Sequence, residues 1–427
     1  MGGPAVAKAP TAHQNMSSKT EKAGLSFVEF VIIISLMMSL TAMSIDAMLP
    51  ALSHIGSDLN VQNANDRQLV VSVIFVGIAF GQLFFGPLSD KTGRKPTIYL
   101  GYAFFVTGAL VSATAASFPI MLGGRLLQGF GASAPRAVTL ALVRDRYEGR
   151  AMARVMSFVM TVFILVPMIA PTLGQGILLF SGWRSIFGGF VLMALITLVW
   201  FGLRMPETLA PEDRAPFTLR RILDATLEIV RNRTALGYTV SAGLVSGAFI
   251  GYLNSSQQIF QEQYALGELF PLFFGVIAFS IGLASLLNTR LVMRFGMRFL
   301  VQQSLVLIVV LSILALGVAL LATGQPPLWF LMAYIMMTFF CVGILFGNQN
   351  SLAMEPLGHL AGIGAAVVGS LSTLISMPLG TIIGQSYNGT VFPLVIGLGT
   401  LSGLSILVVR WAESKDENEY RLPMPPS

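Results

Sequence analysis

Twelve long apolar segments limit what this chain of 427 residues can fold into. A helix that crosses a bilayer needs about 20 mostly apolar residues, and continuous runs favour helices over barrel strands, which are short and alternate. Only 11% of the residues are charged, whereas soluble domains carry roughly 25%. We therefore expect an all-α membrane protein. Its twelve transmembrane helices are expected at residues 27–49, 68–86, 97–116, 120–143, 155–180, 185–203, 234–257, 268–291, 299–322, 327–352, 362–385 and 391–409.

The basic residues alternate from loop to loop. Both tails and the loops after the second, fourth, sixth and eighth segments carry nearly all of them, whereas the other loops hold little more than Arg67 and Arg184. Loops rich in lysine and arginine stay in the cytoplasm, so we expect both termini there, as an even number of segments also requires. Residues 1–26 and 412–427 are then cytoplasmic tails. The net charge of +6 reflects this topology, and no nucleic acid partner is expected.

One long polar break, residues 205–233, divides the apolar segments into two groups of six. It contains three prolines, and its later part, residues 219–230, has the pattern of a short amphipathic helix that could lie on the inner membrane surface. We therefore expect a cytoplasmic linker between two six-helix bundles, residues 27–204 and 234–411.

The loop between the second and third segments carries a motif that resembles the signature loop of the major facilitator superfamily. The matching residues are Gly86, Asp90, Gly93, Arg94 and Lys95. The resemblance implies two bundles around a central cavity and a conformational latch at the cytoplasmic side. In that latch Arg94 pairs with Asp145, and Asp90 engages the start of the eleventh helix near Gly362 and Gly364. Alternatively, the cations serve membrane topology alone.

The fourth and fifth segments extend the resemblance. Arg125 opens an Arg-x-x-Gln-Gly sequence that is similar to a motif of drug:proton antiporters. The fifth segment holds a loosened form of the antiporter motif of that helix, for which the resemblance implies a hinge. The hinge residues are Pro167, Pro171, Gly174 and Gly176. The sequence from Asp46 to Leu52 is similar to the corresponding stretch in proteins of the bicyclomycin and chloramphenicol resistance branch.

Asp46 and Arg125 fall inside apolar segments at similar depths. At about 1.5 Å per residue they lie about 6 Å and about 9 Å below the outer surface. A charge inside a membrane helix is costly and usually has a function. Burial and a nearby cation act in opposite directions on the proton affinity of a carboxyl group. We expect Asp46 to bind and release a proton, with Arg125 assisting. Alternatively, Asp46 solvates a helix end in a water-filled mouth, and Arg125 forms a fixed ion pair or clamps backbone carbonyls.

Further side chains are expected to bind substrate together with Asp46. Arg136 lies about 16 Å deeper than Arg125 on nearly the same helix face, so both can line one cavity. The other candidates are Gln128, Tyr252, Asn254, Gln257 and Asn348. As alternatives, Arg136 snorkels toward the inside, and the neutral groups only hydrogen-bond neighbouring helices.

The sequence predicts a carrier and no enzyme. It has no phosphate loop of the Gly-x-x-x-x-Gly-Lys-Ser/Thr type, and the single Cys341 and scattered histidines give no metal site, so we expect no cofactor. The resemblance implies a monomer in a bacterial inner membrane that exports small amphipathic drugs or metabolites. Cationic or neutral polar substrate would compete with the proton near Asp46. Uptake of a metabolite or sugar by the same fold, or a non-transporting sensor or scaffold, are the alternatives.

Overall fold

The computed structural model describes residues 25–414, which form helices and connecting turns without a strand. Twelve helices are long and apolar enough to cross a membrane, which confirms the predicted fold class. They are α2 (Phe27–Asp46), α4 (Leu69–Thr92), α5 (Arg94–Ala113), α6 (Phe118–Arg146), α7 (Gly149–Ser181), α8 (Arg184–Arg204), α10 (Arg233–Gln257), α11 (Phe270–Phe295), α12 (Met297–Leu321), α13 (Leu328–Met354), α14 (Ala361–Gln385) and α15 (Phe392–Glu413). The predicted tails, residues 1–26 and 412–427, lie almost entirely outside the described residues.

Shorter segments extend or connect these helices. They are η1 (Leu49–Ala51) and α3 (Leu52–Asp58) after α2, η2 (Ala64–Gln68) before α4, η3 (Pro211–Asp213) and α9 (Leu219–Arg231) in the linker, η4 (Gln258–Gln263) after α10, η5 (Gly267–Leu269) before α11 and η6 (Glu355–Leu357) after α13. The π-helical η4 continues α10 as a polar extension, Gln-Ile-Phe-Gln-Glu-Gln.

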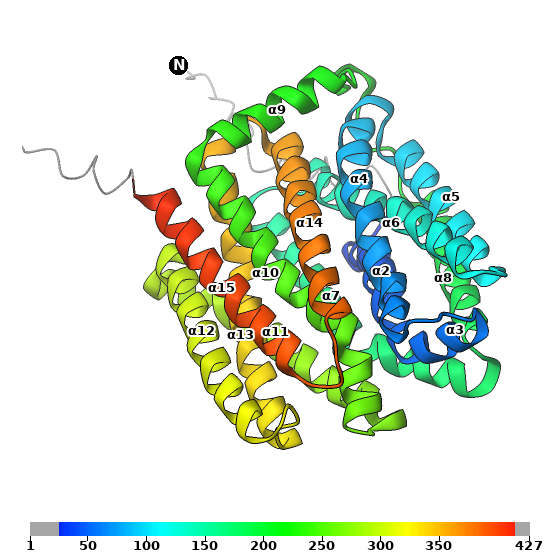
Figure 1. The fold of residues 1–427 in the computed structure, drawn as a ribbon. Coiled ribbons are helices and arrows are strands. Elements are labelled where there is room, and N and C mark those ends of the chain that lie inside the picture. The colour runs from blue at the N-terminus through cyan, green and yellow to red at the C-terminus, as the bar shows by residue number, and fades with distance from the viewer. Residues whose placement is uncertain (1–24, 415–427) are drawn as a thin grey trace, which may run out of the picture.

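The helices pack as two bundles of six (Figure 1). In the first bundle α6 packs against α4 and α5, and α2 against α7. In the second, α10 packs against α14 and α15, and α11 against α13. The bundles meet along two helix pairs, α4 with α14 and α7 with α11, and Figure 1 shows α4 and α14 side by side at this boundary. The interface is therefore made mainly by one pair of helices from each half.

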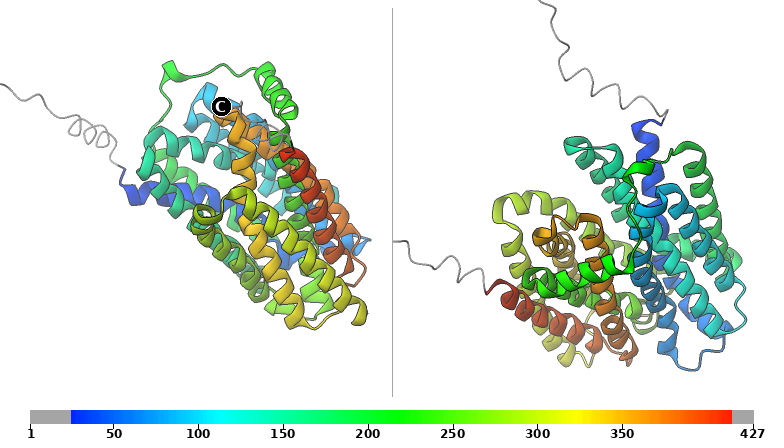
Figure 2. Two further views of the ribbon diagram at one scale, coloured as in Figure 1. Left: turned by 90° about the vertical axis from the view of Figure 1, so that its left-hand side faces the viewer. Right: turned by 90° about the horizontal axis from the view of Figure 1, so that it is seen from above.

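The molecule has two chemically different ends. We call the end that holds the α4–α5 turn, the last turns of α6 and α8, and α9 the basic end. Both ends of the described chain lie there, because Arg146 at the end of α6 donates to the Leu25 carbonyl (3.1 Å) and Arg233 at the start of α10 donates to Ser414 (2.5 Å). The other end, formed by α3, η2, η4 and the α14–α15 turn, is called the opposite end. Figure 2 shows α9 lying across the basic end.

Glycine allows the same sharp turn at corresponding places in the two halves. Gly93 joins α4 to α5 with φ 103°, and Gly296 joins α11 to α12 with φ 80°. These left-handed values are open to glycine and costly for other residues. Because each turn lies between the second and third helix of its half, the two loops are structural equivalents, although the second has Met293 where the first has Asp90.

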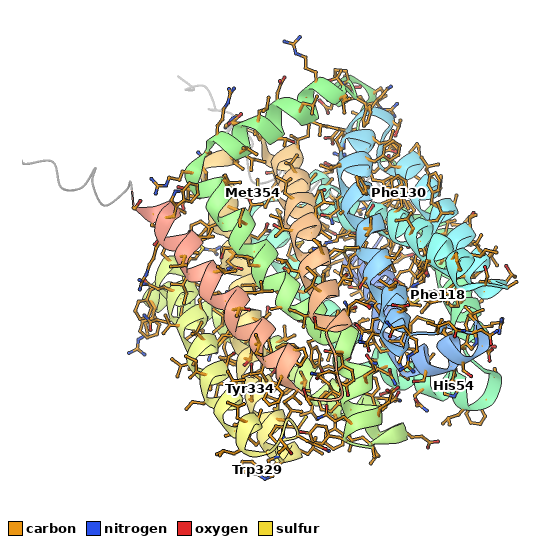
Figure 3. All side chains as sticks on the ribbon, viewed as in Figure 1. His54, Phe118, Phe130, Trp329, Tyr334 and Met354 are labelled. Atoms are coloured by element: carbon orange, nitrogen blue, oxygen red, sulfur yellow. The ribbon has the colours of Figure 1, made fainter. Side chains whose placement is uncertain are left out.

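Aromatic and apolar side chains fill the first bundle. Phe130 of α6, labelled in Figure 3, contacts Phe85 of α4 and Phe104 of α5 at ring-centroid distances of 5.0 Å and 5.2 Å. Such tilted and edge-on pairs add to the energy of close packing. In contrast, many large apolar residues of the outer helices are exposed, for example Leu321 at 90%, as lipid contact requires.

Candidate functional site

Asp46 ends α2 and is 6% exposed. Among residues 25–414 no group hydrogen-bonds its carboxylate. The backbone around it is held from two sides, because Arg125 of α6 bonds the Ser44 carbonyl and α7 packs at Ala47. The helix also ends here, so Asp46 lies at the negative pole of the α2 dipole. This is a poor place for a fixed negative charge, and a suitable one for a carboxyl group that changes its protonation state.

The guanidinium of Arg125 is fully buried at 0% exposure. It donates to the carbonyl oxygens of Ser44 (2.8 Å) and Val70 (3.0 Å) and to Gln128 Oε1 (2.7 Å). No ion pair with Asp46 occurs within the described residues. The geometry is that of the carbonyl clamp, and it also caps the C-terminal end of α2, where carbonyls lack helical partners. The coupling role of Arg125 stays a prediction, and these contacts give it a route through the α2 backbone.

Two glycines of the Arg-x-x-Gln-Gly region explain how α6 reaches its neighbours. A Cβ on Gly129 would lie 2.1 Å from the Ile74 carbonyl oxygen of α4, and one on Gly124 would lie 2.4 Å from Ser112 Oγ of α5. The small residues bring α6 close enough for Arg125 to reach α4. The glycines of this region thus serve helix packing, while Arg125 supplies the charge.

Tyr252 of α10 supplies the second bundle's side of the Asp46 site. It is fully buried, stacks on Phe274 with a centroid distance of 5.9 Å and meets Phe339 edge-on at 4.6 Å. Its hydroxyl has no hydrogen-bond partner within the described residues, and it lies within electrostatic range of Asp46. A buried unpaired hydroxyl is unfavourable, so this group is available to a ligand or to Asp46.

Three further predicted substrate residues, Asn254, Gln257 and Asn348, make direct protein contacts. Asn348 and Asn288 exchange amide hydrogen bonds of 3.0 Å and 3.3 Å between α13 and α11. Asn254 donates to Ser72 Oγ of the first bundle (2.9 Å), and Gln257 donates to Ser53 Oγ (2.9 Å). For Asn348 the arrangement is the interhelical alternative, whereas Asn254 and Gln257 tie the two bundles together.

Asn254 and Gln257 belong to a larger polar network that joins the bundles at the opposite end. We call it the interbundle belt. Its members are Ser53, Asn65, Arg67, Gln68 and Ser72 of the first half, and Asn254, Gln257, Gln258, Glu262, Gln385 and Tyr387 of the second. Arg67 and Glu262 form its ion pair at 3.0 Å. Asn65 donates to the carbonyls of Gln385 (2.9 Å) and Tyr387 (2.8 Å).

Most belt residues were missed by the sequence interpretation, which assigned Arg67 only to a loop. The available signal was the cluster of amides at the ends of the second and seventh segments. That signal is weak, because loops are polar in any membrane protein. Only the hydrogen bonds between the two halves identify these residues as one network.

The predicted latch residues lie together at the basic end. Arg94 donates to Asp145 Oδ2 (2.9 Å), Asp90 Oδ1 (2.7 Å) and Ser89 Oγ (2.8 Å). All these groups belong to the first bundle. The Asp90 carboxylate thus faces Arg94, and the point that approaches α14 is Gly86, where a Cβ would lie 3.4 Å from Ala366 Cβ. The Arg94–Asp145 contact is present, while engagement of α14 by Asp90 stays a prediction.

Glu207 is a further member of this cluster that the sequence interpretation missed. Its carboxylate accepts the backbone N–H groups of Arg94 (2.9 Å) and Lys95 (3.0 Å). It therefore caps the N-terminus of α5, where the helix dipole and free N–H groups favour an anion. A Cβ on Gly93 would meet this carboxylate at 2.7 Å, which gives the motif glycine a second purpose. Glu207 lies far from its partners in sequence, so no local cap signal marks it.

Residues 34–381 match the Major Facilitator Superfamily. The chain belongs to this superfamily. The resemblance read from the signature loop is thereby confirmed, and so is its consequence that the protein is a carrier rather than an enzyme.

Two curated members of the superfamily match nearly the whole chain. It is 27% identical over 391 residues to the "Bicyclomycin resistance protein homolog" of Haemophilus influenzae, covering 91% of this chain and 96% of the relative. It is 28% identical over 422 residues to the "Chloramphenicol resistance protein" of Pseudomonas aeruginosa, covering 95% and 96%. Among solved structures it resembles the xylose transporter XylE of E. coli in a partially occluded inward-open conformation, with a TM-score of 0.68 at 15% identity over 90% of this chain and 96% of that one.

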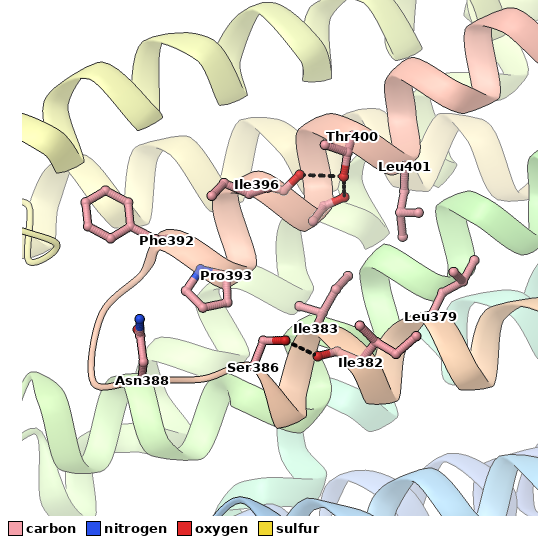
Figure 4. Close-up of a pocket in the computed structure, with 11 residues that line it drawn as sticks. Leu379, Ile382, Ile383, Ser386, Asn388, Phe392, Pro393, Ile396, Thr400 and Leu401 are labelled. Carbon is pink, nitrogen blue, oxygen red and sulfur yellow. Dashed lines mark hydrogen bonds between the residues drawn. The ribbon is translucent and has the colours of Figure 1, made fainter.

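Two surface grooves lie apart from the site of this superfamily member. One, of about 440 Å³, lies between α14 and α15 (Figure 4) and is lined mostly by apolar residues, with Thr400 of α15 and with Ser386 and Asn388 at the connecting turn. The other, of about 650 Å³, runs along α8 beside Trp200. Neither is lined by a predicted site residue, so we assign neither to substrate.

The predicted hinge lies within α7, which runs as one helix through Pro167 and Pro171. Its two glycines differ. A Cβ on Gly174 would lie 1.9 Å from the Ala47 carbonyl oxygen, directly after Asp46, whereas a Cβ on Gly176 would have no neighbour within 4 Å. Gly174 therefore sets the approach of α7 to the end of α2, and the hinge role of this segment stays a prediction.

We expect Gly174→Ala to destabilise the carrier and Gly176→Ala to leave it unchanged. The added methyl group at position 174 has no room, and overpacking of this kind costs about 1–3 kcal/mol. Thermal unfolding of the purified protein should show a lower Tm for Gly174→Ala alone. Equal Tm values for the two variants would mean that α7 moves away from α2 without cost.

Proposed function

We propose that this carrier exports small amphipathic compounds in exchange for protons across a bacterial inner membrane. The observation that carries the proposal is the buried Asp46, whose carboxylate, like the Tyr252 hydroxyl within its electrostatic range, has no hydrogen-bond partner among residues 25–414. An ionisable group in such a place usually marks an ion or proton pathway in membrane proteins. The superfamily match and the resistance proteins among its relatives support export.

The charge distribution supports one orientation of the protein in the membrane. The basic end carries the lysines and arginines of the α4–α5 turn, α6, α8 and α9, and positively charged loops remain in the cytoplasm. We infer that the basic end faces the cytoplasm, which puts both termini there. One chain supplies both sides of the Asp46 site, so we infer that a monomer is sufficient.

The interbundle belt supports an inward-facing assignment of this state. Its hydrogen bonds and the Arg67–Glu262 pair hold the bundles together on the outer side. In an alternating-access cycle these contacts break when the outer side opens. Asp46 then takes a proton from outside as substrate leaves, and the proton is released to the cytoplasm after the belt closes again.

Reversing one charge of the belt is expected to open the outer side. In Arg67→Glu, two carboxylates face each other. A partly exposed ion pair contributes about 1 kcal/mol, and a loss of that size shifts the equilibrium between the closed and the open outer side about fivefold. Ser72→Cys reports this opening, because Ser72 is fully buried at the belt. In a Cys341→Ser background, a membrane-impermeant maleimide applied outside should label Cys at position 72 about fivefold faster.

The charge swap provides the control for this prediction. Arg67→Glu combined with Glu262→Arg restores opposite charges and should return labelling to the slow rate. Fast labelling in both variants, or slow labelling in both, would contradict a gating role for the pair.

Uptake of a small metabolite by the same fold is the alternative function. The likeness to the xylose transporter concerns the fold alone at 15% identity, whereas the resistance relatives match in sequence over nearly their full lengths. Efflux is therefore favoured. The function is tested by expressing the protein in a strain that lacks its own pumps and measuring drug accumulation for a panel of compounds. Lower accumulation of at least one compound, reversed by a protonophore, supports export. Higher accumulation would indicate uptake, and no change for any compound would favour a sensor or scaffold.

A further inference from the structure

Arg136 lies within the membrane helix α6, in the half that ends at the basic end. It is exposed, although its neighbours from Ala132 to Pro135 and then Val138 are buried. Among residues 25–414 it has no ion pair and no hydrogen bond. It lies about 15 Å before Arg146, the last residue of α6, at about 1.5 Å per residue. Such a charge is tolerated only where water or a polar ligand reaches it.

The neighbours of Arg136 show which way it faces. Ala132 marks the side of α6 that touches α2, because Thr41 Oγ1 donates to its carbonyl (3.0 Å). Ser133 marks the side that touches α4, since a Cβ on Gly81 would lie 2.1 Å from its Oγ. One turn later, Arg136 falls between these two directions. It thus faces the gap between α2 and α4 at the inner surface of the bundle, and not the lipid.

A second unpaired donor lies at nearly the same depth. Gln82 follows Gly81 on α4, is 7% exposed, and its Nε2 has no partner within the described residues. Its Oε1 lies against Gly369 of α14, where a Cβ would come within 2.5 Å. The side chain therefore stands at the bundle boundary. One turn beyond Arg136 on the same face, Leu140 is 37% exposed and offers an apolar contact.

We propose that Arg136 and the Gln82 amide bind an anionic group, such as a carboxylate or sulfonate, of the exported compound. Both groups donate hydrogen bonds, and the fixed fork of a guanidinium matches a carboxylate in two-point geometry. The apolar body of the compound would rest near Leu140. The proposal rests on the transport function above and narrows its substrates to amphipathic anions. Asp46 lies near the opposite end, so proton and anion occupy separate groups, and bundle movement couples them.

Snorkelling does not account for Arg136. A snorkelling arginine reaches the interface with its charged head, but the end of α6 is farther away than the side chain reaches. The basic end also has its own arginine on this helix, Arg144, which is exposed. Arg144 is therefore a matched control for general attraction of anions to a positive surface.

The test measures binding to the purified full-length carrier in nanodiscs, without a proton gradient. Two matched probe pairs differ mainly in one negative charge, namely chloramphenicol hemisuccinate against its methyl ester, and dansylglycine against its carboxamide. We expect the wild-type carrier to bind the anionic member of at least one pair about tenfold more tightly. In Arg136→Gln this preference should fall to about onefold by loss of the anionic member's affinity, with the neutral member unchanged. Arg136→Lys should keep part of the preference, and Gln82→Leu should reduce it about threefold.

Arg144→Gln should keep the full preference. The proposal is overturned if the wild-type carrier binds no anionic probe more tightly than its neutral partner, if Arg136→Gln keeps the preference, or if Arg144→Gln abolishes it equally. Because no gradient is applied, these outcomes are independent of proton coupling, which is tested separately by substrate-induced proton release in Asp46→Asn. If Arg136→Gln still exports neutral compounds with wild-type proton coupling, the proposed export function stands, whatever the outcome for anionic substrates.

Discussion

Asp46→Asn is expected to abolish proton release when substrate is added to inverted vesicles, with a loss of at least tenfold in coupled transport. Asparagine keeps the size of the side chain, but its amide cannot bind and release a proton near neutral pH. Asp46 is also the only acidic side chain in the described structure that lies buried at the bundle boundary. A pH-sensitive dye reports the proton release, and uptake of labelled drug reports transport.

Substrate exchange without net flux should survive in Asp46→Asn, because exchange needs only binding and movement of the loaded carrier. Asp58→Asn is the matched control, since Asp58 lies at the same end in an exposed ion pair with Arg184 at 3.0 Å. It should couple normally. Undiminished proton release in Asp46→Asn would end the role proposed for this carboxyl group.

Arg125→Met is expected to lower both the thermal stability of the carrier and its coupled transport. The variant removes the donors to the Ser44 and Val70 carbonyls and to Gln128, and leaving such groups unpaired costs about 1–3 kcal/mol. The end of α2 also loses its cap, so the backbone beside Asp46 is no longer fixed. We expect transport per folded molecule to fall at least tenfold, measured together with Tm.

Arg125→Lys separates the two effects, because an ammonium group can serve one carbonyl but cannot span all three acceptors. It should keep much of the stability and only part of the transport. Leu126→Met is the control on the lipid-facing side, since Leu126 is 41% exposed. If Arg125→Met lowers Tm while each folded molecule transports normally, Arg125 is a clamp and takes no part in coupling.

The signature loop shows how far sequence reasoning reached at the site. The resemblance named Arg94 and Asp145 as partners, and the two side chains form an ion pair, while their role as a latch stays a prediction. It did not give Glu207, which lies in the linker after α8 and caps α5. A cap supplied from a distant segment leaves no mark in the local sequence of the helix that it caps.

The two buried charges show the limit more sharply. Depth follows from position in a span, so Asp46 and Arg125 were placed at similar levels. Contact depends on how the helices are rotated, and the guanidinium turned out to face the Ser44 and Val70 carbonyls. Lipid is as apolar as a helix interface, so an apolar span does not record which of its faces meets another helix.

The chain's own sequence determined the twelve spans, the two halves, the signature loop and the identity of the buried charges. These are properties of hydrophobicity, length and charge counted along the chain. The tertiary structure alone decided that Arg125 caps α2, that amides and the Arg67–Glu262 pair join the bundles at the opposite end, and that Arg136 has no hydrogen-bond or ion-pair partner among residues 25–414. Each of these depends on side chains from different helices meeting, and that is fixed by rotation and tilt during packing.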